Sequence, residues 1–257
     1  MKIKKIILFA SPRSGSNLLV NILGQCPEIT FHNEVFHPSE PQIALPEHLR
    51  KKWHDYDKRI SFHKEYISDV VKQSYRLNKQ IKYVGFKILL SPPQLKIFEQ
   101  FINDDDIYWI SLNRDNKLQM FTSQEIAVET KEWIMPQGTK IYEDLRTGFW
   151  NKFNNSNRKQ HQIKFDGDKF RGYLNRLKEL EEHYKLVEAQ KNVLKLEYLE
   201  VRSEQVVEIL SNFLNLDEWN YGHKIKKQNS ENVLDRVSNK FSMIKFLVAN
   251  GYYSYLK

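Results

Sequence analysis

Residues 3–19, IKKIILFASPRSGSNLL, decide the fold class of this chain. The run Ile3–Phe9 is short, β-rich and apolar from Ile6 onward, which is typical of a parallel strand buried on both faces. A loop of small residues follows, and apolar residues then recur at helical spacing as far as Gly24. The segment therefore predicts a strand, a tight loop and a helix in succession.

The strand pattern recurs three more times along the chain. Apolar runs cover residues 83–90, 106–112 and 193–199, and helical patterns lie between them. Strands that alternate with helices favour a mostly parallel α/β sheet with right-handed crossovers. We expect one domain over residues 1–257, with helical and loop insertions near 40–78 and 131–168.

Several of the intervening segments are expected to be helical. The polar and aromatic stretch 47–77 is one of them, and Pro92 and Pro93 open another helix. Residues 116–130 follow the third strand as a further helix. Apolar positions from 170 to 187 mark one long amphipathic helix.

Composition restricts the class of protein and its partners. With 40% hydrophobic and 13% aromatic residues, the 257-residue chain can bury a core, which excludes a disordered protein. Lysine and arginine number 40 against 32 acidic residues, which leaves a net charge of +8. This surplus indicates a negatively charged partner and leaves nucleic acid, anionic lipid, a nucleotide and an acidic glycan open.

The sequence also bears on disulfides and membranes. The single cysteine, Cys26, excludes an intrachain disulfide. No apolar run approaches the roughly 20 residues that a membrane helix needs. The N-terminus begins like a signal peptide, but its apolar part, Ile6–Ala10, leads directly into the loop. We expect no stable membrane insertion and a cytoplasmic protein, or one trimmed of an anchor.

The loop after the first strand has the composition of an anion site. Small residues let backbone N–H groups converge, and a helix N-terminus adds the positive end of its dipole. Against the nucleotide-binding pattern G-x-x-x-x-G-K-[ST], Gly15 is kept, but Ser16 replaces the Lys and Asn17 replaces the Mg²⁺-binding hydroxyl. Because ATP and GTP hydrolysis need both groups, we expect neither. Arg13 can supply the missing charge; the alternative is an ordinary turn with an exposed arginine.

A second polar motif begins at the end of the third predicted strand, in LNRDNKLQMFTSQEIA. Arg114 follows this strand, at the sheet edge where ligands bind in open α/β folds. Ser123 lies nine residues later on the predicted helix, with Thr122 beside it. A guanidinium and a hydroxyl returning to that edge can bind a second phosphate. The alternative is a solvated arginine and an ordinary helical serine.

Together the two motifs resemble those of sulfotransferases that use 3′-phosphoadenosine-5′-phosphosulfate (PAPS), most of all the bacterial carbohydrate sulfotransferases of the nodulation-factor type. PRSGSNLL is similar to their 5′-phosphosulfate loop, and Arg114 with Ser123 is similar to their 3′-phosphate motif. Segments 85–91 and 193–201 and a C-terminal pattern also fit. The chain departs from the family at Asn17, where Thr is usual. The nine-residue offset of Ser123, where many members have eight, makes Thr122 a competing candidate.

The resemblance implies a P-loop-NTPase-like three-layer fold with a mostly parallel central sheet flanked by helices. It implies PAPS as sulfuryl donor, 3′-phosphoadenosine-5′-phosphate (PAP) as product, no metal, and a hydroxyl of a carbohydrate or glycolipid as acceptor. The two insertions would cover the acceptor. The donor would be bound by Ser11, Arg13, Ser14, Gly15, Ser16, Asn17, Arg114, Thr122 or Ser123, and Lys227 of the basic segment 223–232.

A base must accept the proton of the acceptor hydroxyl. Glu34, in ITFHNEVFHP, follows a short predicted strand, and the resemblance makes it the first candidate. His32 and His37 are its rivals, because the ordinary pKa of histidine suits the task better. Lys87, inside the strand at 83–90, can orient the acceptor or neutralise the transition state. The alternatives are a surface carboxylate for Glu34 and a lysine that reaches solvent for Lys87.

Three other functions compete with sulfuryl transfer. A kinase with a phosphate loop, or another nucleotide-binding protein acting on a small molecule, is the first alternative. A nucleic-acid-binding module is the second, but the positive charges are scattered among acidic ones and no recognised motif appears, so we expect no nucleic-acid partner. A non-catalytic nucleotide-binding protein is the third. The sequence specifies neither the acceptor nor the oligomeric state.

Overall fold

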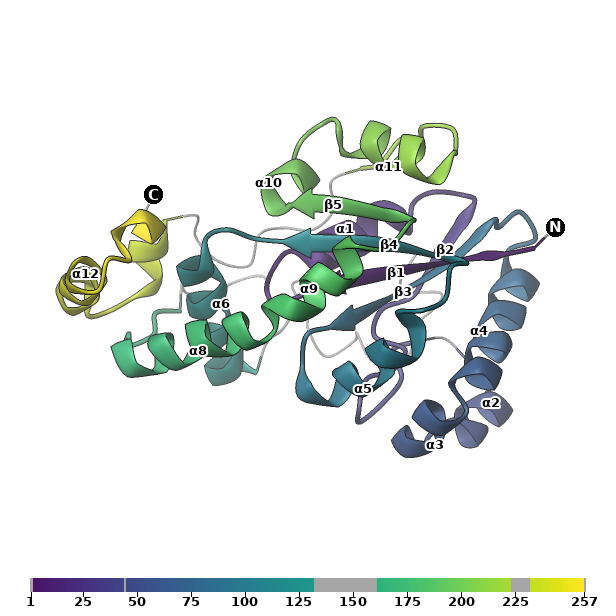
Figure 1. Cartoon of the computed structure of the whole chain (residues 1–257), viewed down its shortest axis with the longest axis horizontal. Helices are drawn as coiled ribbons and strands as arrows, with labels where there is room; N and C mark the ends of the chain where they lie inside the picture. The colour runs from purple at the N-terminus through teal and green to yellow at the C-terminus, as the bar shows by residue number, and fades with distance from the viewer. Residues whose placement is uncertain (1, 44, 132–160, 223–231, 257) are drawn as a thin grey trace. The chain divides into compact units, whose positions relative to one another are not determined.

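The structure is a computed structural model of the chain (Figure 1). It describes residues 2–43, 45–131, 161–222 and 232–256.

The chain divides into two compact units. The first, here called the sheet unit, comprises Met1–Asn113 and His183–His223. The second, here called the helical unit, comprises Arg114–Glu182 and Lys224–Lys257. The interpretation of residues 1–257 as one domain stays a prediction.

A parallel sheet forms the centre of the sheet unit. Its strand order is β2-β3-β1-β4-β5, and every neighbouring pair runs parallel. Ile6–Phe9 of the central strand are fully buried, as expected for a strand covered on both faces. The bounds are β1 Lys4–Ala10, β2 Ile29–Phe31, β3 Tyr83–Leu89, β4 Ile107–Asn113 and β5 Val193–Glu197.

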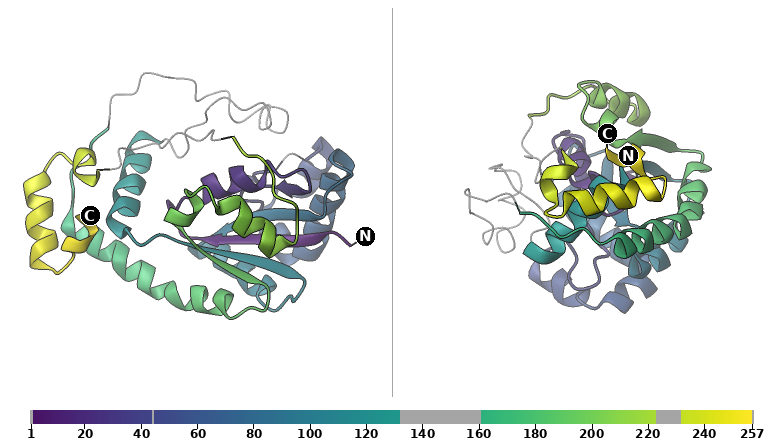
Figure 2. Two further views of the ribbon diagram at one scale, coloured as in Figure 1. Left: turned by 90° about the horizontal axis from the view of Figure 1, so that it is seen from above. Right: turned by 90° about the vertical axis from the view of Figure 1, so that its left-hand side faces the viewer.

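Helices cover both faces of this sheet. They are α1 Ser16–Leu23, α2 Glu47–Lys52, α3 Tyr56–Ser61, α4 His63–Leu77, α5 Pro92–Phe101, α9 Glu181–Glu188, which begins two residues before the sheet unit resumes, α10 Tyr198–Val201 and α11 Val206–Leu214. On one face α1, α10 and α11 share an aliphatic core with β1 and β4 (Figure 2). On the other face aromatic residues of α4, α5 and α9 pack together; the ring centroids of Phe98 and Phe9 lie 4.9 Å apart. The expected three-layer α/β fold, with a parallel central sheet flanked by helices, is confirmed, and its likeness to P-loop NTPases stays a prediction.

The helical unit has an aromatic core of its own. Phe121 packs against Phe170 and Tyr173, with ring centroids 5.2 and 5.6 Å apart. Ile163 and Val237 form an isolated parallel bridge, which joins two parts of this unit that are far apart in the sequence. Its elements are α6 Lys117–Thr130, α8 Gly167–Glu179, η1 Val233–Arg236, α12 Lys240–Ala249 and η2 Tyr253–Leu256.

The segment 47–77, predicted to be helical, forms three helices, and the long helix predicted over 170–187 is divided in two. Segment 47–77 forms α2, α3 and α4, because the Asp55 carboxylate accepts a hydrogen bond from the Lys58 amide, 2.7 Å away, and so begins α3 as a separate helix. Segment 170–187 breaks at Leu180, between α8 and α9.

The fourth predicted strand is shorter than expected. β5 ends at Glu197, whose amide donates to the Glu200 side chain across 2.6 Å in a capping box that begins α10. Leu199, predicted as the last strand residue, is 71% exposed on that helix.

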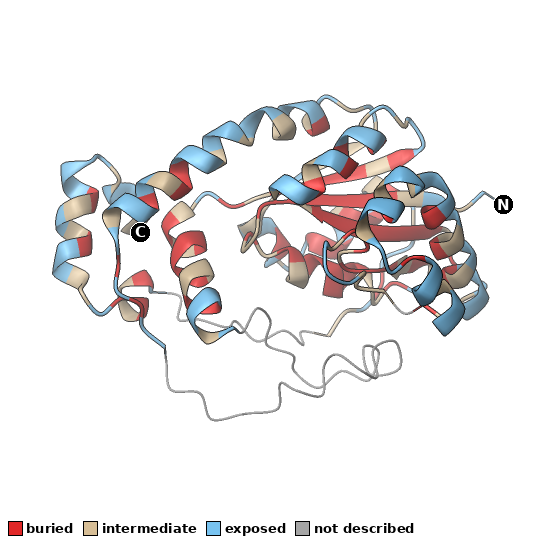
Figure 3. Ribbon diagram, turned by 90° about the horizontal axis from the view of Figure 1, so that it is seen from below, coloured by how far each residue is buried: buried red, intermediate tan, exposed pale blue. Residues whose placement is uncertain are grey.

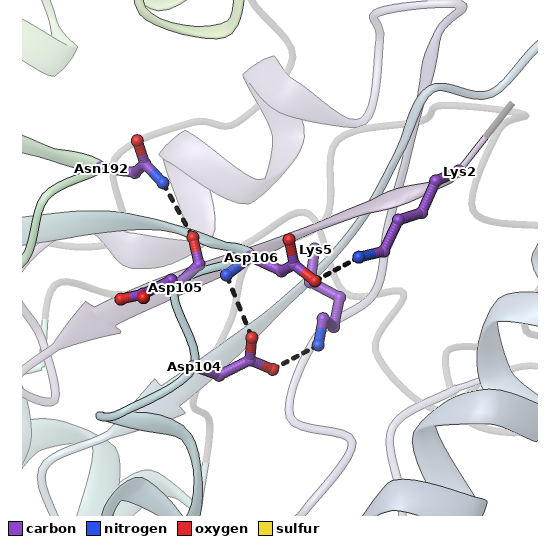
Figure 4. A network of polar contacts seen from close by, with 6 residues as sticks. All are labelled: Lys2, Lys5, Asp104, Asp105, Asp106 and Asn192. Carbon is purple, nitrogen blue, oxygen red and sulfur yellow. Dashed lines mark hydrogen bonds and ion pairs between the residues drawn. The ribbon is translucent and has the colours of Figure 1, made fainter.

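Ion pairs hold the N-terminal edge of the sheet (Figure 4). Lys5 pairs with Asp104 at 2.5 Å, and Lys2 pairs with Asp106. The Asn192 amide donates to the Asp105 carbonyl at 3.0 Å and so joins the residues before β4 to those before β5. These contacts tie the acidic turn before β4 to β1 and to the residue before β5, at the edge of the sheet opposite the loop after β1.

Burial follows the layers of the sheet unit. Strands β1, β3 and β4 are buried over most of their length, whereas the outer faces of the helices are exposed (Figure 3). Within the described ranges no helix is both long and apolar enough to cross a bilayer.

Gly85→Ala should destabilise the sheet unit. Gly85 pairs with Phe31 of β2, and an added Cβ would lie 2.2 Å from the Phe31 ring carbon Cδ2. Because Phe31 is buried, the ring cannot move into solvent, and we expect a loss of about 1–3 kcal/mol in the free energy of unfolding. Urea unfolding followed by circular dichroism measures it.

Gly172→Ala is the matched control, since its Cβ would meet only the end of Arg176 at 3.8 Å, inside α8. Alanine is the better helix former by about 1 kcal/mol, so this variant should be slightly more stable than wild type. A Gly85→Ala protein as stable as wild type would contradict the close approach of β2 and β3.

Candidate active site

The loop between β1 and α1 turns sharply through two left-handed residues. Arg13 has φ 67° and Gly15 has φ 101°, and the Ser14 amide donates to the Ser11 carbonyl at 3.3 Å. Gly15 is the N-cap of α1. Because the first amides of a helix have no acceptor within it, this turn directs the N-terminus of α1 and its positive dipole end toward a ligand.

The side chains of the loop suit an anion. The Ser14 hydroxyl is fully buried and has no hydrogen-bond partner among the described residues, so it can serve a ligand oxygen. Ser11 and Ser16 are also buried. These hydroxyls and the amides of α1 are a donor set that fits a phosphate or a phosphosulfate.

Only glycine fits at position 15, because the loop backbone there lies against a side chain of α10. A Cβ at Gly15 would lie 2.4 Å from Cδ2 of Tyr198, the first residue of α10. The Tyr198 ring therefore packs directly on the loop backbone, with the Arg202 guanidinium 6.0 Å from its centroid.

Lys87 connects the loop to the predicted base. Its ammonium donates to the Asn17 side-chain oxygen at 2.6 Å and lies 3.4 Å from Glu34 Oε1. The lysine is 3% exposed, so it does not reach solvent, and a buried ammonium needs such partners. Backbone pairing brings these residues together: the Lys87 amide donates to the Asn33 carbonyl at 3.1 Å, which continues the β2–β3 pairing to the residue before Glu34.

Gln94 holds the other oxygen of Glu34. Its side-chain amide donates to Glu34 Oε2 at 2.9 Å, and its carbonyl oxygen accepts from the Leu89 amide at 2.7 Å. Gln94 is 2% exposed, so these bonds form away from water. Both carboxylate oxygens of Glu34 thus have a protein neighbour, while its side chain keeps 12% of its surface exposed.

The two candidate histidines each have a serine neighbour. The Nε2 atom of His32 is 2.8 Å from the Ser74 hydroxyl, which itself donates to the Val70 carbonyl inside α4. The Nδ1 atom of His37 is 2.9 Å from the Ser39 hydroxyl. Glu34 is linked through the Lys87 ammonium to Asn17, in the first turn of α1.

The second predicted anion motif lies in the helical unit. Arg114 follows β4 directly and is 7% exposed; its Nη2 donates to the Gln119 side-chain oxygen at 2.5 Å. The Thr122 hydroxyl donates to the Leu118 carbonyl at 3.0 Å and accepts from Arg236 at 3.3 Å, whereas Ser123 stands next on α6. These bonds engage Thr122 within the protein.

Sequence reasoning missed Gln94 and Tyr184. The pattern Ser91-x-x-Gln94 after a strand is a capping-box signal that marks Gln94, but as a cap rather than as a partner of Glu34. Tyr184 appears in the sequence only as one apolar point of a helix, yet its hydroxyl lies 2.8 Å from the Ser11 amide. Lys227 lies outside the described residues.

Similar backbones occur among solved sulfotransferases. No protein-family model matches the sequence, and no curated protein matches it. A sulfotransferase from Alicyclobacillus acidocaldarius has 13% sequence identity and a TM-score of 0.46, over 97% of this chain and 96% of that one. The sulfotransferase domain from the curacin biosynthetic pathway has 15% identity and a TM-score of 0.46, over 94% and 86%. A mouse sulfotransferase complexed with PAP has 15% identity and a TM-score of 0.44, over 99% and 84%.

Gly15→Ala should remove anion binding by the loop. An L-residue at φ 101° is strained by about 1–2 kcal/mol, and the new Cβ would lie 2.4 Å from Tyr198. We expect a lower melting temperature and loss of the additional stabilisation that sulfate gives the wild type. A thermal-shift titration with sodium sulfate, with chloride at equal ionic strength for comparison, measures both.

Gly251→Ala provides the control, because Gly251 also has positive φ (74°) but nothing within 4 Å of the added Cβ. It should lose stability and keep the sulfate response. If Gly15→Ala retains that response as well, the loop is not the anion site.

Proposed function

We propose that this chain transfers a sulfuryl group from PAPS to a hydroxyl group of an acceptor. One observation carries the proposal. The Lys87 ammonium donates to Asn17, in the first turn of α1 directly after the loop, and also lies beside the predicted base Glu34. An anion loop and a carboxylate thus belong to one polar network. Transfer from a bound anionic donor to an oxygen nucleophile needs both an anion site and a base.

The loop would hold the 5′ end of the donor. Ser11, Ser14, Ser16 and the first amides of α1 would donate hydrogen bonds to its oxygens, and Arg13 would stabilise the negative charge that develops during transfer. PAPS supplies the sulfuryl group when bound. Ser16 and Asn17 replace the lysine and the hydroxyl that nucleotide hydrolases use with Mg²⁺, so we propose that transfer needs no metal.

Glu34 would accept the proton of the acceptor hydroxyl. Its remaining exposed surface leaves the carboxylate accessible to an acceptor, and Gln94 fixes its orientation through Oε2. His32 is the weaker candidate because its ring is bonded to α4. The Lys87 ammonium would neutralise charge as the proton moves and orient the acceptor beside Glu34.

The 3′-phosphate is assigned to the helical unit. Arg114 would supply the charge and Ser123 the hydroxyl. Thr122, whose hydroxyl bonds to Leu118 and Arg236, is the alternative source of that hydroxyl. Lys227 stays a proposed nucleotide contact.

The acceptor is proposed to be a carbohydrate or glycolipid, as for the nodulation-factor-type enzymes that the motifs resemble. Segments near 40–78 and 131–168 would select it. We propose that the reaction takes place in the cytoplasm.

Calorimetric titration with PAP, ATP and AMP, each with and without Mg²⁺, tests the proposal. PAP should bind more tightly than ATP, and its affinity should not depend on Mg²⁺. ATP binding that requires Mg²⁺ and exceeds that of PAP would favour the kinase alternative.

Arg114→Ala should weaken the binding of PAP about tenfold or more, since charge-assisted hydrogen bonds are worth about 1.5–3 kcal/mol, and should hardly change the binding of AMP. Equal losses for both nucleotides would remove the 3′-phosphate assignment.

Glu34→Gln should reduce turnover about 100-fold or more and leave PAP affinity within about twofold, because a general base acts on the acceptor and not on the donor. Transfer of labelled sulfate from PAPS to a panel of sugars, lipid-linked glycans, phenols and peptides measures turnover. His32→Gln is the matched control and should retain most activity. If His32→Gln loses turnover and Glu34→Gln keeps it, His32 and not Glu34 is the base.

A further inference from the structure

Tyr184 of α9 reaches the first residue of the loop. Its hydroxyl oxygen lies 2.8 Å from the Ser11 amide nitrogen and 3.1 Å from the Ser11 Oγ. The same oxygen is 3.1 Å from the carbonyl of Leu112 in β4. One phenol therefore contacts the residue that leaves β1 and a residue near the end of β4.

The hydrogens of this contact can be assigned in part. The Ser11 amide can only donate, so the Tyr184 oxygen accepts there. The phenol has one proton, which goes to the Ser11 Oγ or to the Leu112 carbonyl. The Ser11 carbonyl in turn accepts from the Ser14 amide. Both backbone polar groups of Ser11 are thus occupied within the sheet unit.

The position of the phenol does not depend on its hydroxyl. The Tyr184 ring packs edge-on against Phe9 of β1, with centroids 5.3 Å apart at 71°. Phe9 is fully buried and also contacts Phe98 and Trp109. Burial raises the pKa of Tyr184 to about 12, so the group is a neutral phenol at any pH at which the protein is studied.

We propose that Tyr184 is a positioning residue for the 5′-phosphosulfate loop, which rests on the function proposed above. By binding the Ser11 amide, Tyr184 fixes where the loop leaves β1. The hydrogen bond between the Ser14 amide and the Ser11 carbonyl extends this constraint to the left-handed turn at Arg13 and Gly15. The amides proposed to bind the anion are those of residues after Ser11. Tyr184 orients these amides through Ser11 and does not contact the donor.

Tyr184→Phe tests this, with Tyr83→Phe as the matched control. The Tyr83 hydroxyl also donates to a buried backbone carbonyl, that of Leu214, at 2.6 Å, and burial likewise raises its pKa to about 12. Both variants should lose similar stability. Tyr184→Phe alone should weaken PAP and AMP by the same factor, about three- to tenfold, and raise KM for PAPS by that factor with kcat within about twofold.

Amide hydrogen exchange gives a second measurement on the unliganded protein. In the wild type the Ser11 amide should be protected, and in Tyr184→Phe the peptide over residues 10–15 should exchange faster while the rest of β1 is unchanged. An unprotected Ser11 amide in the wild type, or PAP affinity equal in wild type and Tyr184→Phe, would overturn the assignment. Wild-type protein that binds no PAP would instead refute the proposed function, while the exchange result would still judge the contact of Tyr184 with the loop.

Discussion

A buried ammonium constrains the arrangement of the site. Lys87 lies on the central part of the sheet, on the face that α1 covers, where an unpaired charge would cost several kcal/mol. Its partners come from two different elements: Asn17 from α1 and Glu34 from the segment after β2. The charge therefore fixes the distance between the anion loop and the carboxylate, and Gln94 fixes the orientation of that carboxylate.

The sequence predicted those parts of the structure that depend on local pattern. The alternation of strands and helices and the turn between β1 and α1 follow from neighbouring residues, whereas the roles of Glu34 and Lys87 stay predictions. Gln94 and Tyr184 could not be assigned in this way, because their roles consist of hydrogen bonds to residues far along the chain. The early end of β5 has a local cause, a capping box hidden within a β-rich run.

The two proposed anion sites rest on different kinds of support. In the sheet unit, the proposal is supported by the buried Ser14 hydroxyl, which can donate to an anion, and by the left-handed turn before α1. In the helical unit, Arg114 has a side-chain partner in Gln119, and Thr122 and Ser123 are alternative sources of the hydroxyl. The first site depends on backbone shape, whereas the second depends on side chains of α6 and on Arg114, which lies between β4 and that helix.

The Tyr184–Leu112 hydrogen bond has a consequence for how this protein can vary. The chain leaves the sheet unit after Asn113 and returns at His183, so residues 112 and 184 stand at the base of the whole excursion 114–182. Their contact keeps the two ends of that excursion adjacent. Segments whose ends are fixed side by side tolerate insertion and deletion, since a longer closed loop costs little extra entropy. Lengthening or shortening the excursion can therefore leave the position of Ser11 unchanged.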